Sequence, residues 1–164
     1  MKRPSAGRLR PTMARVRESL FAILEPYLEG AVVLDLFAGT GGLGLEALRR
    51  GAARAVFVES DPRSLRVLQE NLRGEARATV VRGRLPGALE RLTGPFDLIL
   101  ADPPYGSPAG LETLGRLEPL GRPGSLAVFE HHHKEPYPER CGALELFRRE
   151  RYGETALSFY RWTA

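Results

Sequence analysis

The chain has 164 residues, of which 43% are hydrophobic and 27% charged, as in ordinary globular proteins. No run approaches the roughly 18 apolar residues of a membrane-spanning helix, so we expect no membrane partner. Cys141 is the single cysteine, which excludes an intramolecular disulfide and favours a reducing, cytoplasmic location. This length suits a single domain, which we expect over residues 1–164, with a short basic segment and a helix at 1–25.

The net charge of +4 and the sequence pI of about 9.6 favour a polyanionic partner. The basic residues Lys2, Arg3, Arg8, Arg10, Arg15 and Arg17 all precede the first acidic residue, Glu18. A block of one sign is typical of a segment that binds phosphates, although a solvated basic tail would have the same composition.

The elements alternate along the chain. The first is a helix over residues 11–26, in which Val16, Leu20 and Leu24 share one face. Strands and helices then alternate, with strands at 31–37, 55–60, 78–82, 96–101 and 125–131, and helices at 42–51, 61–74, 85–92 and 110–120. Two strands close the chain, at 143–153 and 154–162, and meet at a tight turn near Gly153.

Continuous apolar strands separated by helices predict an α/β fold with a sheet covered on both faces. We expect seven strands, mostly parallel, with an antiparallel hairpin at the C-terminal end. Ligands of such sheets bind beyond the carboxyl ends of the strands. The strand ends at 35–42, 58–60, 82–85 and 101–105 are therefore the candidate site.

Glycines dominate the first strand end, "DLFAGTGGLG", where Gly39, Gly41 and Gly44 match G-x-G-x-x-G. Small residues let the backbone approach a ligand in front of a helix N-terminus. Asp35 favours a ligand with an ammonium group over a pyrophosphate, but it could equally accept the N–H groups of the loop.

Three further residues suit an adenine nucleoside. Glu59 ends the second strand, where an acid can accept both hydroxyls of a ribose. Nicotinamide cofactors and S-adenosylmethionine both carry that ribose. Arg84 and Leu85, at the third strand end, would lie near the adenine.

The fourth strand runs into "ADPPYG", residues 101–106. Two prolines end the pairing and stiffen an extended tip. The Asp102 carboxylate and the Pro103 carbonyl could together accept the hydrogens of an exocyclic amine and so orient its lone pair. Tyr105 offers a flat surface for an extruded base.

These motifs resemble those of S-adenosylmethionine-dependent amino-group methyltransferases with an (Asp/Asn/Ser)-Pro-Pro-(Tyr/Phe/Trp) tetrad. Within them, "LRPTMARVRESLFAIL", "VLDLFAGTGGLGLEALRRGA", "FVESD", "LADPPY" and "RYGETALSFY" are similar to the RsmD-type 16S ribosomal RNA guanine-N2 methyltransferases. The resemblance implies a Rossmann-like class I methyltransferase sheet. It also implies methylation of one guanine of 16S ribosomal RNA in the small (30S) subunit, with ribosomal proteins present.

The resemblance also implies roles for residues. We expect S-adenosylmethionine to be held by Asp35, Phe37, Gly39, Gly41, Glu59, Ser60, Arg84 and Leu85. The guanine would be held by Asp102, Pro103 and Tyr105, and RNA by Arg10, Arg15 and Arg17.

Other functions remain open from the sequence. A DNA adenine-N6 methyltransferase would use the same tetrad, but the chain has no spare length for a target-recognition region. An NAD-dependent oxidoreductase would explain the glycines and Glu59 but not Asp102 to Tyr105, and a non-catalytic RNA-binding module would explain only the basic start. We expect no metal, since adjacent residues such as His131, His132 and His133 point alternately to opposite sides of an extended segment.

Overall fold

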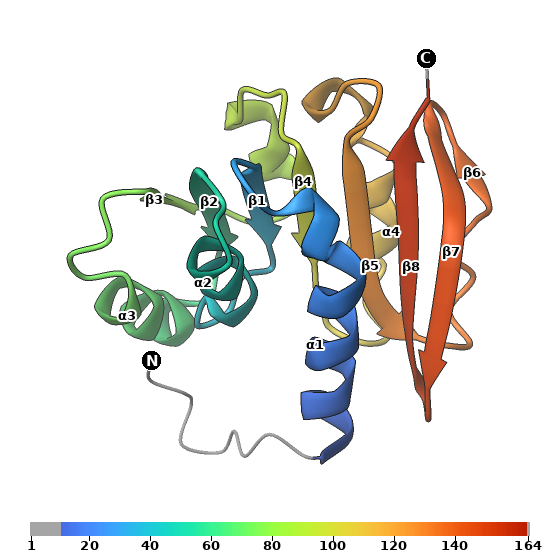
Figure 1. Cartoon of the computed structure of the whole chain (residues 1–164), viewed down its shortest axis with the longest axis horizontal. Coiled ribbons are helices and arrows are strands. Elements are labelled where there is room, and N and C mark those ends of the chain that lie inside the picture. Colours follow the sequence, from blue (N-terminus) through green and yellow to red (C-terminus); the bar gives the residue numbers. More distant parts are fainter. Residues whose placement is uncertain (1–10, 164) are drawn as a thin grey trace.

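A computed structural model describes residues 11–163. Its centre is an eight-stranded sheet in the order β3-β2-β1-β4-β5-β8-β7-β6 (Figure 1). The strands are β1 (Val32–Leu36), β2 (Arg54–Glu59), β3 (Ala78–Arg82), β4 (Leu98–Ala101), β5 (Leu126–His132), β6 (Arg140–Cys141), β7 (Leu144–Tyr152) and β8 (Thr155–Trp162). The first five strands are parallel, and β6 to β8 are antiparallel to their neighbours.

This confirms the predicted mostly parallel sheet with a C-terminal hairpin, in which Gly153 turns with a φ of 61°. The predicted count of seven strands was one too low. The additional strand, β6, consists of two residues that pair with Glu145 and Leu144 of β7. Two residues are too few to form a periodic pattern, so its pairing comes from the neighbouring strand and not from its own sequence.

The helices are α1 (Pro11–Leu24), α2 (Gly42–Arg49), α3 (Pro62–Asn71) and α4 (Ala109–Leu114), with 3₁₀ turns η1 (Glu25–Tyr27), η2 (Gly87–Arg91) and η3 (Glu118–Leu120). Two predicted helices are shorter than expected. The one at 85–92 is only η2, and the one at 110–120 divides into α4 and η3 around Gly115. Pro86, Gly87, Gly115 and Pro119 account for this, because both residue types disfavour a continuous helix.

The sheet carries a hydrophobic core on each face. One core packs β-strand residues such as Val128 and Leu126 against α1, α2 and α3. The other packs Ala127 and Phe129 of the same strand against η2, α4 and η3. Along β5, therefore, even-numbered residues face α1 and odd-numbered residues face the opposite layer, as strand geometry requires.

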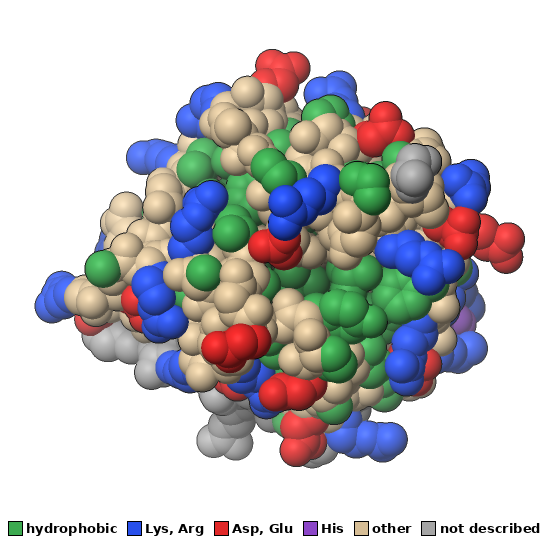
Figure 2. All heavy atoms as spheres, turned by 45° about the horizontal axis from the view of Figure 1, so that its top comes forward, with side chains coloured by type: hydrophobic (Ala, Val, Ile, Leu, Met, Phe, Trp, Pro, Cys, Tyr) green, Lys and Arg blue, Asp and Glu red, His purple; other side chains and the backbone are tan. Residues whose placement is uncertain are grey.

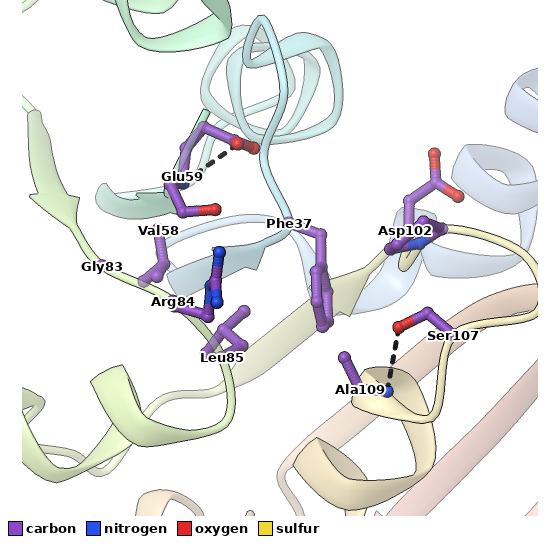
Figure 3. Close-up of a pocket in the computed structure, with 11 residues that line it drawn as sticks. Phe37, Val58, Glu59, Gly83, Arg84, Leu85, Asp102, Ser107 and Ala109 are labelled. Atoms are coloured by element: carbon purple, nitrogen blue, oxygen red, sulfur yellow. Dashed lines mark hydrogen bonds between the residues drawn. The ribbon is translucent and has the colours of Figure 1, made fainter. Parts of the chain in front are cut away.

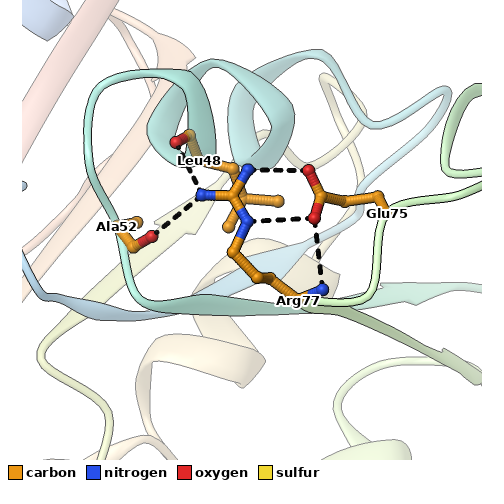
Figure 4. A network of polar contacts seen from close by, with 4 residues as sticks. All are labelled: Leu48, Ala52, Glu75 and Arg77. Carbon is orange, nitrogen blue, oxygen red and sulfur yellow. Dashed lines mark hydrogen bonds and ion pairs between the residues drawn. The ribbon is translucent and has the colours of Figure 1, made fainter.

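Arg77 connects the end of α2 to the beginning of β3 (Figure 4). Its guanidinium donates to both carboxylate oxygens of Glu75, at 2.7 and 2.9 Å. It also donates to the carbonyl oxygens of Leu48 and Ala52, at 3.2 and 3.4 Å. The side chain thus adds hydrogen bonds to two carbonyl oxygens at and just beyond the C-terminal end of α2 and ties them to the start of β3. The hydrogen bonds from Arg77 lower the pKa of Glu75 to about 2.

Strands β1 and β2 point downwards in Figure 1, so the carboxyl ends of the central parallel strands lie on the lower side of the molecule. Figure 2 brings the upper side forward and shows basic and acidic side chains interspersed on it. Within residues 11–163, no helix is both long enough and apolar enough to cross a membrane.

Candidate functional site

A cavity of about 500 Å³ lies beyond the carboxyl ends of β1, β2, β3 and β4, and we call it the first cavity. Phe37 and Leu85 supply apolar walls, while Glu59 and Arg84 supply polar groups. Figure 3 shows Glu59 and Arg84 on one side of Phe37 and Asp102 on the other. Five of the residues predicted to hold a cofactor line this cavity: Phe37, Glu59, Ser60, Arg84 and Leu85.

Glu59 fixes the loops at the rim of the first cavity. Its Oε1 accepts the N–H of Gly39 at 2.7 Å, and its Oε2 accepts those of Ser60 and Asp61 at 3.0 and 2.8 Å. A carboxylate has about four acceptor positions, so one remains for a ligand hydroxyl. The residue can therefore position the glycine loop and still contact a ribose.

The backbone at Phe37 is unusual. Its φ is 56°, and it is the only non-glycine residue with positive φ among those the structure describes. A bulky side chain rarely adopts this left-handed conformation, and such strain is concentrated at functional sites. Here it places the ring in the wall of the first cavity, directly before the glycine loop.

Asp35 lies behind the glycine loop and does not line the first cavity. It is 1% exposed, and its Oδ2 accepts the N–H of Gly44 at 2.9 Å. Gly44 lies in the first turn of α2, whose N-cap Gly41 has a φ of 90° and no capping side chain. Of the two roles open from the sequence, the structure thus places Asp35 as an acceptor for the loop. Burial raises its pKa to about 8.

A second cavity, of about 610 Å³, lies between α1, the tip after β4, the end of β5 and the β7–β8 turn. Asp102, Pro103 and Tyr105 line it together with Arg17 of α1 and Glu130 of β5. Asp102 and Pro104 also line the first cavity, so the two cavities meet at this tip.

The tip that carries Asp102 is held on both sides. Pro103 is buried, and a Cβ added to Gly110 would lie 2.7 Å from its Cγ, so this glycine is needed for the close approach. The Tyr105 hydroxyl and the Thr155 hydroxyl are 2.8 Å apart. The Tyr105 ring is 50% exposed and meets His132 edge-on, so one of its faces can receive a stacked ligand.

Two carboxyl groups face each other in the second cavity. Asp102 and Glu130 both line this cavity, and each carboxyl group perturbs the pKa of the other. Burial and the neighbouring Asp102 raise the pKa of Glu130 to about 8. Burial also raises the pKa of Asp102, even though water reaches it through both cavities. Two neighbouring carboxyl groups in a buried setting do not readily ionise together, so the pair favours a single negative charge.

Arg17 is a positive charge that acts on both members of this pair. It is half-buried, lines the second cavity and lies against Gly42, where an added Cβ would be 2.9 Å from its Nη2. Its charge lowers the pKa values of Asp102, Glu130 and Asp35. Arg15 is exposed and does not line the cavity, and Arg10 lies outside the described residues.

Glu130 was missed by the sequence analysis. The rule that ligands meet the carboxyl ends of parallel strands applies equally to the fifth strand, "SLAVFEH", which carries Glu130. Among residues 11–163, no three His, Cys, Asp or Glu side chains are grouped so that they could bind a metal ion. His131 instead packs against Tyr137 and contacts the Ser158 hydroxyl at 2.7 Å.

The family model "Conserved hypothetical protein 95" matches residues 1–161. YlbH of Bacillus subtilis, named provisionally as an rRNA methyltransferase, is 38% identical over 93% of this chain and 87% of its own. "Ribosomal RNA small subunit methyltransferase D" of Escherichia coli is 35% identical over 96% of this chain and 82% of its own. The chain belongs to the RsmD-type methyltransferase family.

Solved structures agree with this assignment. The protein yhhF of Escherichia coli, named provisionally as a methyltransferase, superposes with a TM-score of 0.88 at 34% identity, over 100% of this chain and 92% of its own. A Thermus thermophilus 16S rRNA N2 G1207 methyltransferase, in complex with AdoMet and guanosine, has a TM-score of 0.76 at 28% identity. That likeness covers 98% of this chain and 45% of the Thermus protein. The class I methyltransferase fold predicted for this RsmD-type chain is thereby confirmed.

Proposed function

We propose that this RsmD-type enzyme transfers a methyl group from S-adenosylmethionine to the N2 amine of a guanine in small-subunit ribosomal RNA. The observation that supports this most directly is the position of Asp102, where the first and second cavities meet. A group-transfer enzyme needs donor and acceptor sites that touch at the reacting atoms, and this chain has two cavities that share one carboxylate.

The first cavity fits S-adenosylmethionine. Its volume of about 500 Å³ lies within the range of small-molecule sites. The remaining acceptor position of Glu59 suits a ribose hydroxyl, and Phe37 and Leu85 can cover the faces of an adenine. When bound, S-adenosylmethionine supplies a methyl group made electrophilic by a positively charged sulfur.

The second cavity suits the acceptor base. Asp102 and the Pro103 carbonyl would accept the two hydrogens of the N2 amine, and Tyr105 would stack on the purine. Held in this way, the amine directs its lone pair towards the first cavity. The amine loses one hydrogen as a proton when its new N–C bond forms, and the ionised Asp102 carboxylate can accept that proton before it passes to water.

The relatives support ribosomal RNA as the partner. The Escherichia coli relative is named for the small ribosomal subunit, and the Thermus protein for the N2 position of a 16S rRNA guanine. Arg10, Arg15 and Arg17 would contact phosphates of the RNA, with Arg17 at the second cavity and Arg15 on the exposed side of α1. We propose a small-subunit particle, with its proteins, as the substrate, and no metal in the reaction.

The test is to incubate the protein with methyl-labelled S-adenosylmethionine and small-subunit particles that lack the modification. Digestion of the RNA and mass spectrometry of the nucleosides should reveal N2-methylguanosine at one position. Label on adenine of duplex DNA, with none on the particles, would favour the DNA adenine-N6 alternative. Binding of NAD in place of S-adenosylhomocysteine, measured by calorimetry, would favour the oxidoreductase alternative.

A further inference from the structure

We propose that Glu130 reads the Watson–Crick edge of the acceptor base by accepting the N1–H of guanine, next to the amine held by Asp102. The inference rests on the proposed function and assigns to Glu130 the selection of guanine over adenine.

The sheet places Glu130 directly beside Asp102. Ala101 at the end of β4 pairs with Phe129 of β5 in parallel register, so the next residues, Asp102 and Glu130, continue side by side. Paired residues of parallel strands point to the same face of the sheet. Val128, two residues earlier, packs in the core under α1, and Glu130 emerges on that same side into the second cavity.

The chemistry of the two carboxyl groups matches guanine. Guanine presents its N1–H and its N2 amine side by side, so its edge offers three hydrogens that neighbouring acceptors can bind. Adenine presents an amine next to N1, which is itself an acceptor. Two adjacent ionised carboxylates are acceptors only. They therefore complement guanine, whereas adenine would set the lone pair of N1 against a carboxylate oxygen.

The charges around Asp102 and Glu130 favour the replacement of their shared proton by the N–H groups of guanine. Without a base, Asp102 and Glu130 hold one proton between them, because burial and mutual repulsion disfavour two charges. When guanine binds, its N–H groups would donate hydrogen bonds to the two carboxylates in place of the shared proton. Arg17 of α1 would stabilise the pair in its doubly ionised form. Base binding would release the proton to water.

A purely structural role for Glu130, as a support for Asp102, makes a different prediction. Loss of such a support would weaken all bases that present a 2-amino group by the same factor. Loss of an N1–H acceptor would weaken only bases that carry that hydrogen. Guanosine and 2-aminopurine riboside separate the two roles, because both carry the 2-amino group and only guanosine has the N1–H.

The experiment measures binding of both nucleosides to full-length protein saturated with S-adenosylhomocysteine. Calorimetry follows guanosine, and the intrinsic fluorescence of 2-aminopurine follows its riboside. The variants are Glu130→Ala and Glu130→Gln. Glu112→Ala is the matched control, because Glu112 is an exposed acid on α4 away from the second cavity.

Glu130→Ala should lower the preference for guanosine over 2-aminopurine riboside by at least about tenfold, as expected for a lost hydrogen bond to a charged group. Glu130→Gln keeps an oxygen that can accept the N1–H and should lose less of the preference. Glu112→Ala should change neither affinity.

Equal weakening of both nucleosides in Glu130→Ala, or an unchanged preference in both Glu130 variants, would overturn the inference. So would the absence of any binding of guanosine by the unaltered protein at millimolar concentration. These results are separate from the proposed function, which fails only if the unaltered protein leaves guanine in small-subunit particles unmethylated.

Discussion

The amide N–H of Gly44 donates a 2.9 Å hydrogen bond to the buried Asp35 carboxyl group, joining the C-terminal part of β1 to the first turn of α2. Burial raises the pKa of this carboxyl from its ordinary value of 3.8 to about 8. The folded protein therefore holds a proton at neutral pH that the unfolded chain releases. This contribution to stability is fully present below about pH 4 and is lost as the pH rises through about 8.

We predict that Asp35→Asn removes this dependence. Between pH 5 and pH 8, the unfolding free energy should fall in the unaltered protein more than in Asp35→Asn. The difference between the two decreases should be at least about 1 kcal/mol. Urea titrations at several pH values measure the difference, with the exposed Glu112→Gln as control. Parallel pH profiles for the unaltered protein and Asp35→Asn would contradict the assignment.

A second prediction concerns Asp102. Asp102→Ala should reduce single-turnover methyl transfer to small-subunit particles by at least about 100-fold, the scale of losing an orienting group in the transition state. Affinity for S-adenosylhomocysteine should change by less than about tenfold, because Asp102 only borders the first cavity.

Asp102→Asn is the informative partner of Asp102→Ala. It keeps one oxygen that can accept an amine hydrogen and should retain more activity than Asp102→Ala. A near-normal single-turnover rate in Asp102→Ala would remove this residue from the reaction.

A third prediction separates the two arginines of α1. Arg17 lowers the pKa values of Asp102 and Glu130, so Arg17→Met should raise them. Because the ionised forms are needed, activity should rise with pH, and Arg17→Met should move the midpoint of that rise to higher pH. The measurement is the pH profile of single-turnover rates.

Arg15→Met is the matched control on the same helix. Arg15 is exposed and away from the acid pair, so its loss should leave the midpoint in place. Instead, the slope of log affinity against log salt concentration for particle binding should become shallower by the amount expected for about one lost phosphate contact. Identical shifts of the midpoint in both variants would refute a local effect of Arg17.

A fourth prediction concerns stability away from the site. Arg77→Lys keeps the charge but loses the planar fork that reaches Glu75, Leu48 and Ala52 together. We expect Arg77→Lys to lower the unfolding free energy, because a lysine ammonium cannot make all four hydrogen bonds at once. Arg66→Lys, on the exposed face of α3, should cost less than about 0.5 kcal/mol. Equal stability of Arg77→Lys and Arg66→Lys would mean that the network contributes nothing.

The sequence predicts the sheet well because its strands are continuous apolar runs and its helices carry clear end signals. At α3, Asp61 accepts the N–H of Ser64 and Pro62 begins the helix, as local capping rules require. The two-residue β6 and the interrupted helix around Gly115 could not be predicted so easily. The pairing of β6 depends on β7 and not on its own sequence. The interruption follows from Gly115 and Pro119, whose effect the apolar pattern of the segment concealed.

The candidate site was predictable only in part. Strand ends show where ligands meet the sheet, but not which polar groups face each other there. The placement of Asp102 beside Glu130 depends on the register of β4 and β5, which the sequence does not state. The role of Asp35 was left open because side-chain direction depends on burial and on the course of the glycine loop.

The hydroxyl contact between Tyr105 and Thr155 has a consequence for synthesis. The walls of the first cavity are complete once residue 109 has been made, whereas the second cavity also needs the turn at residues 153–155, close to the C-terminal end. A growing chain therefore contains every residue that lines the first cavity well before it contains Thr155, so the second cavity is the last of the two to be completed.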